Sequence, residues 1–205
     1  MNKIDVSIKT DLVKKYLPKA VSYSEYYETV GQHAQNGTTT GELHSEALVN
    51  YTKLNNSRMK RLAKTVRVPE EIQKKFIDFI GKQTWLVITE SWCGDAAQSM
   101  PAMNILAELT PNIDLKVILR DENPELMDAF LTNGTRGIPK LIVLDGEKDE
   151  VIGEWGPRPS IATQMAFDYK AVHGKLTPEF KQDLQVWYNN DKSQNIIEDL
   201  AGLLD

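Results

Sequence analysis

The sequence has only one cysteine, Cys93, among its 205 residues. One thiol cannot form a disulfide within the chain, so disulfides do not hold this protein together. Chains without disulfides are usual in reducing compartments, and we therefore expect a cytoplasmic protein. The lone sulfur also limits the chemistry, because closing an internal disulfide requires two cysteines.

Long hydrophobic runs are missing as well. No uninterrupted apolar stretch approaches the roughly 18 residues that a helix needs to cross a membrane. The polar segment 1–21 lacks the apolar core and the small-residue cleavage site of a signal peptide. We therefore expect no association with a membrane.

An excess of positive charge is also absent. The chain has 24 basic and 29 acidic residues, which gives a formal net charge of -5. Lysine and arginine do not cluster with aromatic residues, so nucleic acid is not an expected partner. The short basic run 58–67 is typical of a solvated helix face.

Residue spacings that bind metals or nucleotides do not occur either. His33, His44 and His173 lie far in sequence from Cys93, and no spacing of cysteine and histidine suits a metal ion. No glycine-rich phosphate-binding loop is found. We expect neither a metal nor a cofactor. A Cys–His pair would require the fold to bring distant residues together.

Three regions can be distinguished by their residue patterns. We expect a helical N-terminal extension over 1–68, an alternating α/β domain over 69–172, and a C-terminal helical extension over 173–205 packed on that domain. In the first region, Pro18 and the turn-forming residues 36–41 separate three helical stretches. Apolar residues make up 41% of the chain, which is enough for a sizeable core.

The central region alternates between helical patterns and short apolar runs. Pro69 can open a helix, and Gly81 is expected to end it. A second helix follows Cys93, and a third begins at Asn123 and is expected to end at 133–134. This βαβαββ order predicts an α/β fold with a mixed sheet of about four strands flanked by helices. The predicted strands are 85–89, 113–119, 138–144 and 150–155.

Apolar stripes predict three more helices toward the end of the chain. Residues at helical spacing share one face, and such a face normally packs on a core. The three stripes are Ile161, Met165, Tyr169 and Val172; Phe180, Leu184, Trp187 and Tyr188; and Ile196, Leu200, Leu203 and Leu204.

Cys93 lies between a predicted buried strand and the first turn of a predicted helix. Unpaired N–H groups and the helix dipole stabilise a thiolate there, and such settings lower the thiol pKa from ~8.5 to ~3.5–7.5. Glu90 and Asp95 would oppose this effect, while Arg136 or Arg158 would support it if the fold brings either near. We expect an exposed or semi-exposed reactive thiol. The alternative is a buried structural cysteine.

The segment Trp92-Cys93-Gly94-Asp95-Ala96 resembles the W-C-G-P-C active-site motif of the thioredoxin superfamily. Pro101 falls where that family has a proline that kinks the helix, and a proline within a helix requires such a kink. The segment 121–124 is similar to the family's segment after the second central strand.

Two further segments extend the resemblance, which covers about 69–172. Thr135-Arg136-Gly137-Ile138-Pro139 resembles the family's R-G-I-P loop, whose cis-proline faces the active cysteine. The segment 153–156 resembles the glycine-bearing end of the neighbouring strand. The W-G-P-R-P sequence at 155–159 and the helical N-terminus are similar to a bacterial branch of thioredoxin-like proteins.

Departures from the motif are as informative as the matches. Ala96 replaces the resolving cysteine, Asp95 replaces the motif proline, and Val87 stands where the family has a buried acid that serves the second sulfur. Without that second sulfur, an outside thiol must resolve any mixed disulfide on Cys93.

The resemblance implies a monothiol thiol–disulfide exchange protein with Cys93 as its catalytic residue. Its substrate would be a protein thiol or disulfide, with glutathione or another protein supplying the second thiol. The expected active-site motif is Trp92, Gly94, Asp95 and Ala96, and the expected substrate contacts are Arg136, Ile138, Pro139 and Arg158. The alternative is a non-catalytic peptide- or protein-binding module, because a shared fold does not carry activity with it.

Overall fold

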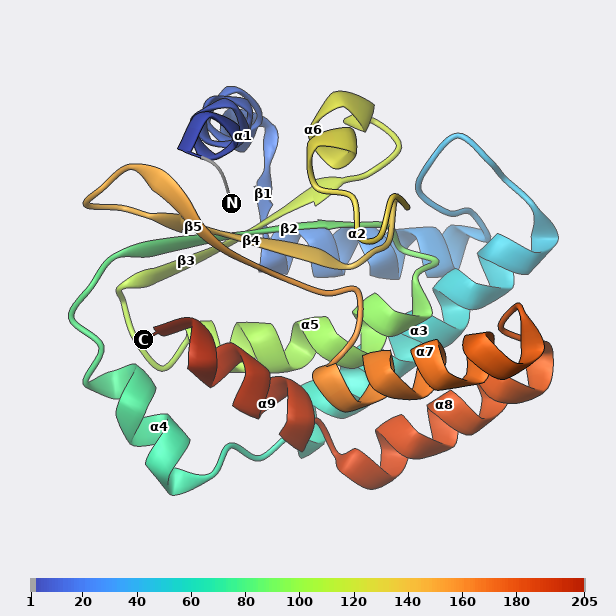
Figure 1. Ribbon diagram of the computed structural model, residues 1–205. Coiled ribbons are helices and arrows are strands. Elements are labelled where there is room, and N and C mark those ends of the chain that lie inside the picture. Colours follow the sequence, from blue (N-terminus) through green and yellow to red (C-terminus); the bar gives the residue numbers. More distant parts are fainter. Residues whose placement is uncertain (1–2, 205) are drawn as a thin grey trace.

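In the computed structural model, which describes residues 3–204, a five-stranded mixed sheet runs through the middle of the molecule (Figure 1). The strand order is β1-β3-β2-β4-β5. The pair β2·β3 is parallel, and every other neighbouring pair is antiparallel. The strands are β1 (Val21–Ser22), β2 (Gln83–Thr89), β3 (Ile113–Leu119), β4 (Lys140–Asp145) and β5 (Glu150–Trp155).

The structure confirms an α/β fold and adds one strand to the expected sheet. Strands β3 and β5 have the bounds predicted from the sequence, while β4 begins at Lys140 and not at Ile138. Pro139 has no N–H group to donate to the sheet, which is consistent with a strand that starts after it. The added strand β1 pairs with β3, where Val21 lies opposite Val117. Two residues are too short a run to show alternation in the sequence.

Helices cover both faces of the sheet (Figure 1). On one face lie α1 and α6, and on the other lie α5 and α9. Because helices cover both faces, the central strand β2 is buried on both sides, and Trp85, Leu86, Val87 and Ile88 are fully inaccessible. The helices are α1 (Lys3–Tyr16), α2 (Tyr23–Asn36), α3 (Glu46–Thr65), α4 (Glu70–Ile77), α5 (Gly94–Ala107), α6 (Pro124–Ala129), α7 (Ser160–His173), α8 (Pro178–Asp191) and α9 (Gln194–Ala201), with short 3₁₀ turns at Leu17–Lys19 and Gly202–Leu204.

Two predicted helix ends are wrong. Helix α4 ends at Ile77, well before Gly81, and Ile80 is 92% exposed, so its place in the apolar spacing was accidental. Helix α6 ends at Ala129, and 133–134 form a turn between the bridged residues Thr132 and Thr135. Asn and Gly favour the left-handed backbone of such a turn as readily as a helix end, so the pattern is ambiguous.

One predicted apolar face is only partly confirmed, because Met165 and Tyr169 pack against the cluster that α7 forms with α8 and the other two residues do not. In α7, Ile161 and Val172 are largely exposed, while Ala162 and Ala166 are buried. The buried face of α7 consists of small residues and packs against α8. A pattern drawn from large apolar residues does not include alanine. In α8 and α9 the predicted stripes are buried at Phe180, Leu184, Tyr188, Ile196 and Leu200.

A membrane-spanning helix is not found within 3–204, because no helix there is both long and apolar enough.

Candidate functional site

Cys93 caps the N-terminus of α5. Its backbone is extended, with φ -75° and ψ 111°, and helical geometry begins at Gly94. The Ala96 N–H donates to the Cys93 sulfur at 3.4 Å, as a capping side chain requires. The sulfur therefore lies at the strand-to-helix junction expected from the sequence.

The loop before β4 lies directly against this sulfur. The Ile138–Pro139 peptide is cis. The Cys93 thiol donates to the Ile138 carbonyl oxygen at 3.2 Å. The fold thus brings together two segments that are far apart in sequence and that the motif comparison had placed in one site.

Burial raises the pKa of the Cys93 thiol, whereas the sequence predicts a lowered pKa. Cys93 is 7% exposed, and loss of solvent raises the pKa of its thiol to about 12, with a further increase from the Asp95 charge. The N–H groups of Ala96 and Asp95 and the Arg158 charge lower this pKa, but their effect is smaller. The expectation of an exposed thiol with a lowered pKa is therefore wrong for this conformation. The sequence could not show how completely other segments would cover the sulfur.

A polar cluster lies at the start of α5, next to Cys93 in the chain. The Arg158 guanidinium pairs with Asp95 at 2.8 Å, and the Tyr188 hydroxyl donates to the same carboxylate at 3.1 Å. Burial raises the pKa of Asp95 and of Tyr188. Tyr188 comes from α8, outside the region of family resemblance, and its apolar spacing in the sequence indicated only a core position.

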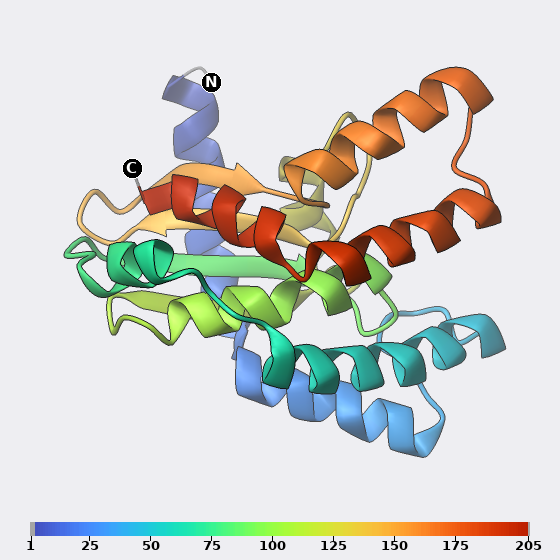
Figure 2. The same cartoon turned by 90° about the horizontal axis from the view of Figure 1, so that it is seen from below.

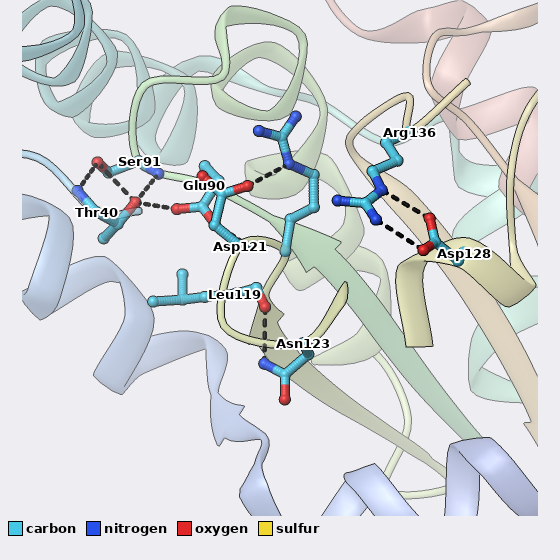
Figure 3. Close-up of polar contacts among 9 residues, drawn as sticks. Thr40, Glu90, Ser91, Leu119, Asp121, Asn123, Asp128 and Arg136 are labelled. Atoms are coloured by element: carbon cyan, nitrogen blue, oxygen red, sulfur yellow. Dashed lines mark hydrogen bonds and ion pairs between the residues drawn. The ribbon is translucent and has the colours of Figure 1, made fainter. Parts of the chain in front are cut away.

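The two arginines proposed as site residues have different positions. Arg158 reaches the site, whereas Arg136 binds Asp128 on α6 through two contacts of 2.6 and 2.7 Å (Figure 3). This fork-to-fork ion pair is exposed. Arg136 is therefore committed to α6 in this conformation.

Trp92 forms another side of the site. The Arg120 guanidinium lies over the Trp92 ring, 4.8 Å from its centroid, and also pairs with Asp121 at 2.7 Å. Stacking of this kind holds an indole ring in one orientation. Arg120 could not be predicted as a site residue, because nothing in its local sequence differs from that of a strand-end residue.

The loop that carries Cys93 is fixed from behind by a buried hydroxyl cluster. The Ser91 hydroxyl contacts Thr40 and Thr52, and its carbonyl accepts from the Asn55 side chain at 2.9 Å. The Ser91 N–H donates to the Thr40 hydroxyl at 2.8 Å (Figure 3). The loop before α3, and α3 itself, therefore position the residues just before the thiol. The threonine run 38–40 is the sequence signal for this cluster, but the same residues are equally typical of a turn.

Glu90 extends this cluster toward β3. It is fully inaccessible, accepts from the Thr40 hydroxyl, and accepts from the Asp121 N–H at 2.8 Å (Figure 3). Burial raises its pKa, and the two hydrogen bonds partly offset that effect. Glu90 is thus a structural carboxyl that links two strand ends.

The end of β5 packs against the cis-proline loop. Gly156 has φ +113°, and a Cβ atom there would lie 2.2 Å from the Pro139 carbonyl oxygen. Only glycine fits this close approach. The Gly156–Pro157 peptide that follows is also cis. The W-G-P-R-P segment therefore serves two purposes, because it packs on Pro139 and delivers Arg158 to Asp95.

A metal site requires several ligating side chains close together. Within the described residues, no group of three or more histidine, cysteine or acidic residues could hold a metal ion. His33 contacts the Thr38 hydroxyl at 2.8 Å, and His173 stacks on Tyr169.

Comparisons with known proteins agree with this geometry. A family model described as thioredoxin matches residues 41–173, beginning upstream of α3. No curated protein matches the sequence. Two solved structures are similar, and at these identities they show a shared fold alone. One is a protein of unknown function from Pseudomonas aeruginosa, with 20% identity, a TM-score of 0.59, and coverage of 90% of this chain and 97% of that one. The other is an HIV epitope-scaffold, with 18% identity, a TM-score of 0.56, and coverage of 90% and 98%.

The family match spans more than half of the chain and includes the Cys93 loop, the cis-proline loop and the end of β5. The chain therefore belongs to the thioredoxin family.

Proposed function

We propose that this protein is a monothiol thiol–disulfide exchange protein that acts through Cys93 and an external resolving thiol. The observation that carries the proposal is the 3.2 Å contact between the Cys93 sulfur, at the start of α5, and the Ile138 carbonyl. An extended segment of a partner can pair with backbone groups at such a loop, which places its sulfur beside Cys93.

The external thiol is the reductant that the reaction needs, and Cys93 first loses its proton to water. The Cys93 thiolate attacks one sulfur of a partner disulfide, a new S–S bond forms, and the old S–S bond breaks. The second sulfur leaves as a thiolate and takes a proton from water. An external thiolate then attacks the partner sulfur of the mixed disulfide, which releases Cys93 as a thiolate. A reducing compartment such as the cytoplasm would supply that external thiol.

The residues around Cys93 support the proposal that an external thiol resolves the mixed disulfide. Ala96 and Val87 are both buried, and they occupy the positions where a dithiol enzyme would carry its second sulfur and a buried acid. Neither side chain can supply or accept a proton or a sulfur. A mixed disulfide on Cys93 therefore has no internal route to release, so the external thiol is part of the proposed cycle.

Turnover of a glutathionylated peptide tests this function. With excess reduced glutathione, the wild-type protein is expected to accelerate release of the peptide thiol above the uncatalysed rate, and Cys93→Ser is expected to abolish the acceleration. Equal rates for the two proteins would refute the proposal. Insulin reduction with dithiothreitol is expected to be weak, since it favours dithiol enzymes.

Burial of the thiol favours a second candidate, a module that binds an extended segment without turnover. In that case Cys93 acts as a buried capping residue. The same assay separates the two candidates, because a binding module leaves the rate of peptide release unchanged for both proteins.

A further inference from the structure

The segment from α7 to α8 reaches the start of α5 beside Cys93, where Tyr188 contacts Asp95, but it is built apart from the main core. Ala162, Ala166, Phe180, Leu184 and Tyr188 form an apolar cluster of their own, distinct from the cluster around the sheet. In Figure 2 these two helices project beyond the ends of the strands. The hairpin therefore has internal packing that survives a change in its position.

The contacts of α8 with the rest of the molecule are largely polar. Gln185 accepts from Gln98 on α5 at 2.9 Å, and Tyr188 donates to Asp95 at 3.1 Å. Asn189 accepts from Arg61 on α3 at 3.0 Å. Water can replace each of these hydrogen bonds when α8 moves, so each contributes a net amount well below its strength in an apolar medium. The bonds that involve the charged Asp95 and Arg61 contribute more than the neutral one.

The base of the hairpin is held more firmly. The Ser160 N–H and hydroxyl both donate to Asp199 of α9, at 2.8 and 2.7 Å, and the Ile161 N–H donates to Asn195 at 2.9 Å. At the other end, the left-handed residues 192–193 turn the chain from α8 into α9. Helix α9 belongs to the main core. The base of the hairpin is thus tied to the main core through α9, whereas the helices beyond the base are not.

From these observations we infer that the α7–α8 hairpin is a hinged lid over the thiol, and that its outward movement exposes Cys93 to a partner disulfide. The movement breaks the α8 contacts at Gln98, Asp95 and Arg61 and leaves the hairpin's own apolar cluster intact. The purpose of the lid rests on the proposed function, since exchange requires access to the sulfur. Its existence does not, because access can be measured with any thiol reagent.

The test uses the full-length chain and the rate at which iodoacetamide alkylates Cys93 at neutral pH. Asn189→Asp adds an ion pair with Arg61 and is expected to slow alkylation, whereas Asn189→Lys adds repulsion and is expected to speed it. Each change is expected to be about two- to fivefold, which corresponds to a surface ion pair. Asn190→Asp and Asn190→Lys, at the exposed neighbour, are matched controls for net charge and are expected to leave the rate unchanged.

Urea below the unfolding transition supplies a second measurement. Opening a lid exposes less surface than global unfolding does. The slope of the logarithm of the alkylation rate against urea concentration is therefore expected to be smaller than the slope that the equilibrium m-value would give. Equal rates for the Asn189 variants, or a urea slope equal to that of global unfolding, would overturn the lid. Either failure leaves peptide release unaffected, so it is distinguishable from failure of the proposed function.

Discussion

At Cys93 two physical effects act on one sulfur in opposite directions. The N–H groups at the start of α5 favour a thiolate, and burial favours the protonated thiol. Burial has the larger effect here, so the resting thiol is protonated near neutral pH. A protonated sulfur is a poor nucleophile and a poor target for oxidation.

The pH dependence of alkylation follows from this raised pKa. A free thiol stops gaining reactivity once pH exceeds ~8.5. Because the Cys93 pKa is raised to about 12, its alkylation rate is expected to keep rising through pH 9 and 10. Stopped-flow or mass-resolved alkylation between pH 6 and 10 checks this, with the unfolded protein in guanidinium as the reference. A plateau below pH 8 would contradict the assigned burial.

Restoring the second sulfur is a further test at this scale. The Ala96 N–H lies 3.4 Å from the Cys93 sulfur, so Ala96→Cys places two thiols within one helical turn. The variant is expected to form an internal disulfide and to gain insulin reduction several-fold over wild type. Ala97→Cys, one position along the same buried turn, is the matched control and is expected to gain little. A gain of equal size in the control would show that position does not matter.

Some residues of the site were predictable and others were not. Cys93, Ile138, Pro139 and Arg158 were predictable because they fall in short motifs, and the structure brings these four together. Tyr188 and Ser91 act through contacts with residues 93 and 51 positions away, respectively, for which no local pattern exists.

At the scale of elements, Asp199 joins three of them. Its carboxylate accepts from the Trp155 indole at the end of β5 and from Ser160 at the start of α7, while Asp199 itself belongs to α9. The lid base and the end of the sheet are therefore tied to one side chain.

Removing that side chain is expected to cost stability. Asp199→Ala deletes an acceptor shared by three hydrogen bonds. The two from Ser160 are exposed and exchange for water, so the bond from Trp155 accounts for most of the loss, and a bond to a charged group contributes about 1.5–3 kcal/mol. We expect a loss of roughly 2–3 kcal/mol in the free energy of unfolding, measured in urea. Glu198→Ala, at the exposed neighbour on the same helix, is the control and should change stability by less than ~0.5 kcal/mol.

Element types were predicted well and their ends less well. Strands β3 and β5 were located to the residue. In β3 the buried Ile113, Leu115 and Val117 alternate with polar residues, which is typical of a half-buried strand. The ends of α4 and α6 were wrong because Gly and Asn terminate helices and form turns equally well.

At the scale of the whole molecule, one apolar cluster connects the three regions of the sequence. Val13, Tyr26 and Met59 from the first region, and Ile196 from the last, belong to the same cluster as the sheet. The division at 68 and 172 stays a prediction, whereas packing is continuous across both positions.

Continuous packing predicts that a defect in the first region weakens the entire core. Met59 on α3 is 1% exposed, and Met59→Ala is expected to lower the free energy of unfolding by about 2–4 kcal/mol. Tryptophan fluorescence and far-UV circular dichroism should report one coincident transition at a lower urea midpoint. Leu54→Ala, at a 45% exposed position of the same helix, is the control. Two separated transitions would show that the first region folds independently.

Intact-mass spectrometry of the native protein with glutathione disulfide at neutral pH tests the account most directly. We predict one glutathione adduct on Cys93, removed by excess reduced glutathione and absent from Cys93→Ser. An adduct that forms only after the protein is unfolded in guanidinium would contradict exchange at this sulfur.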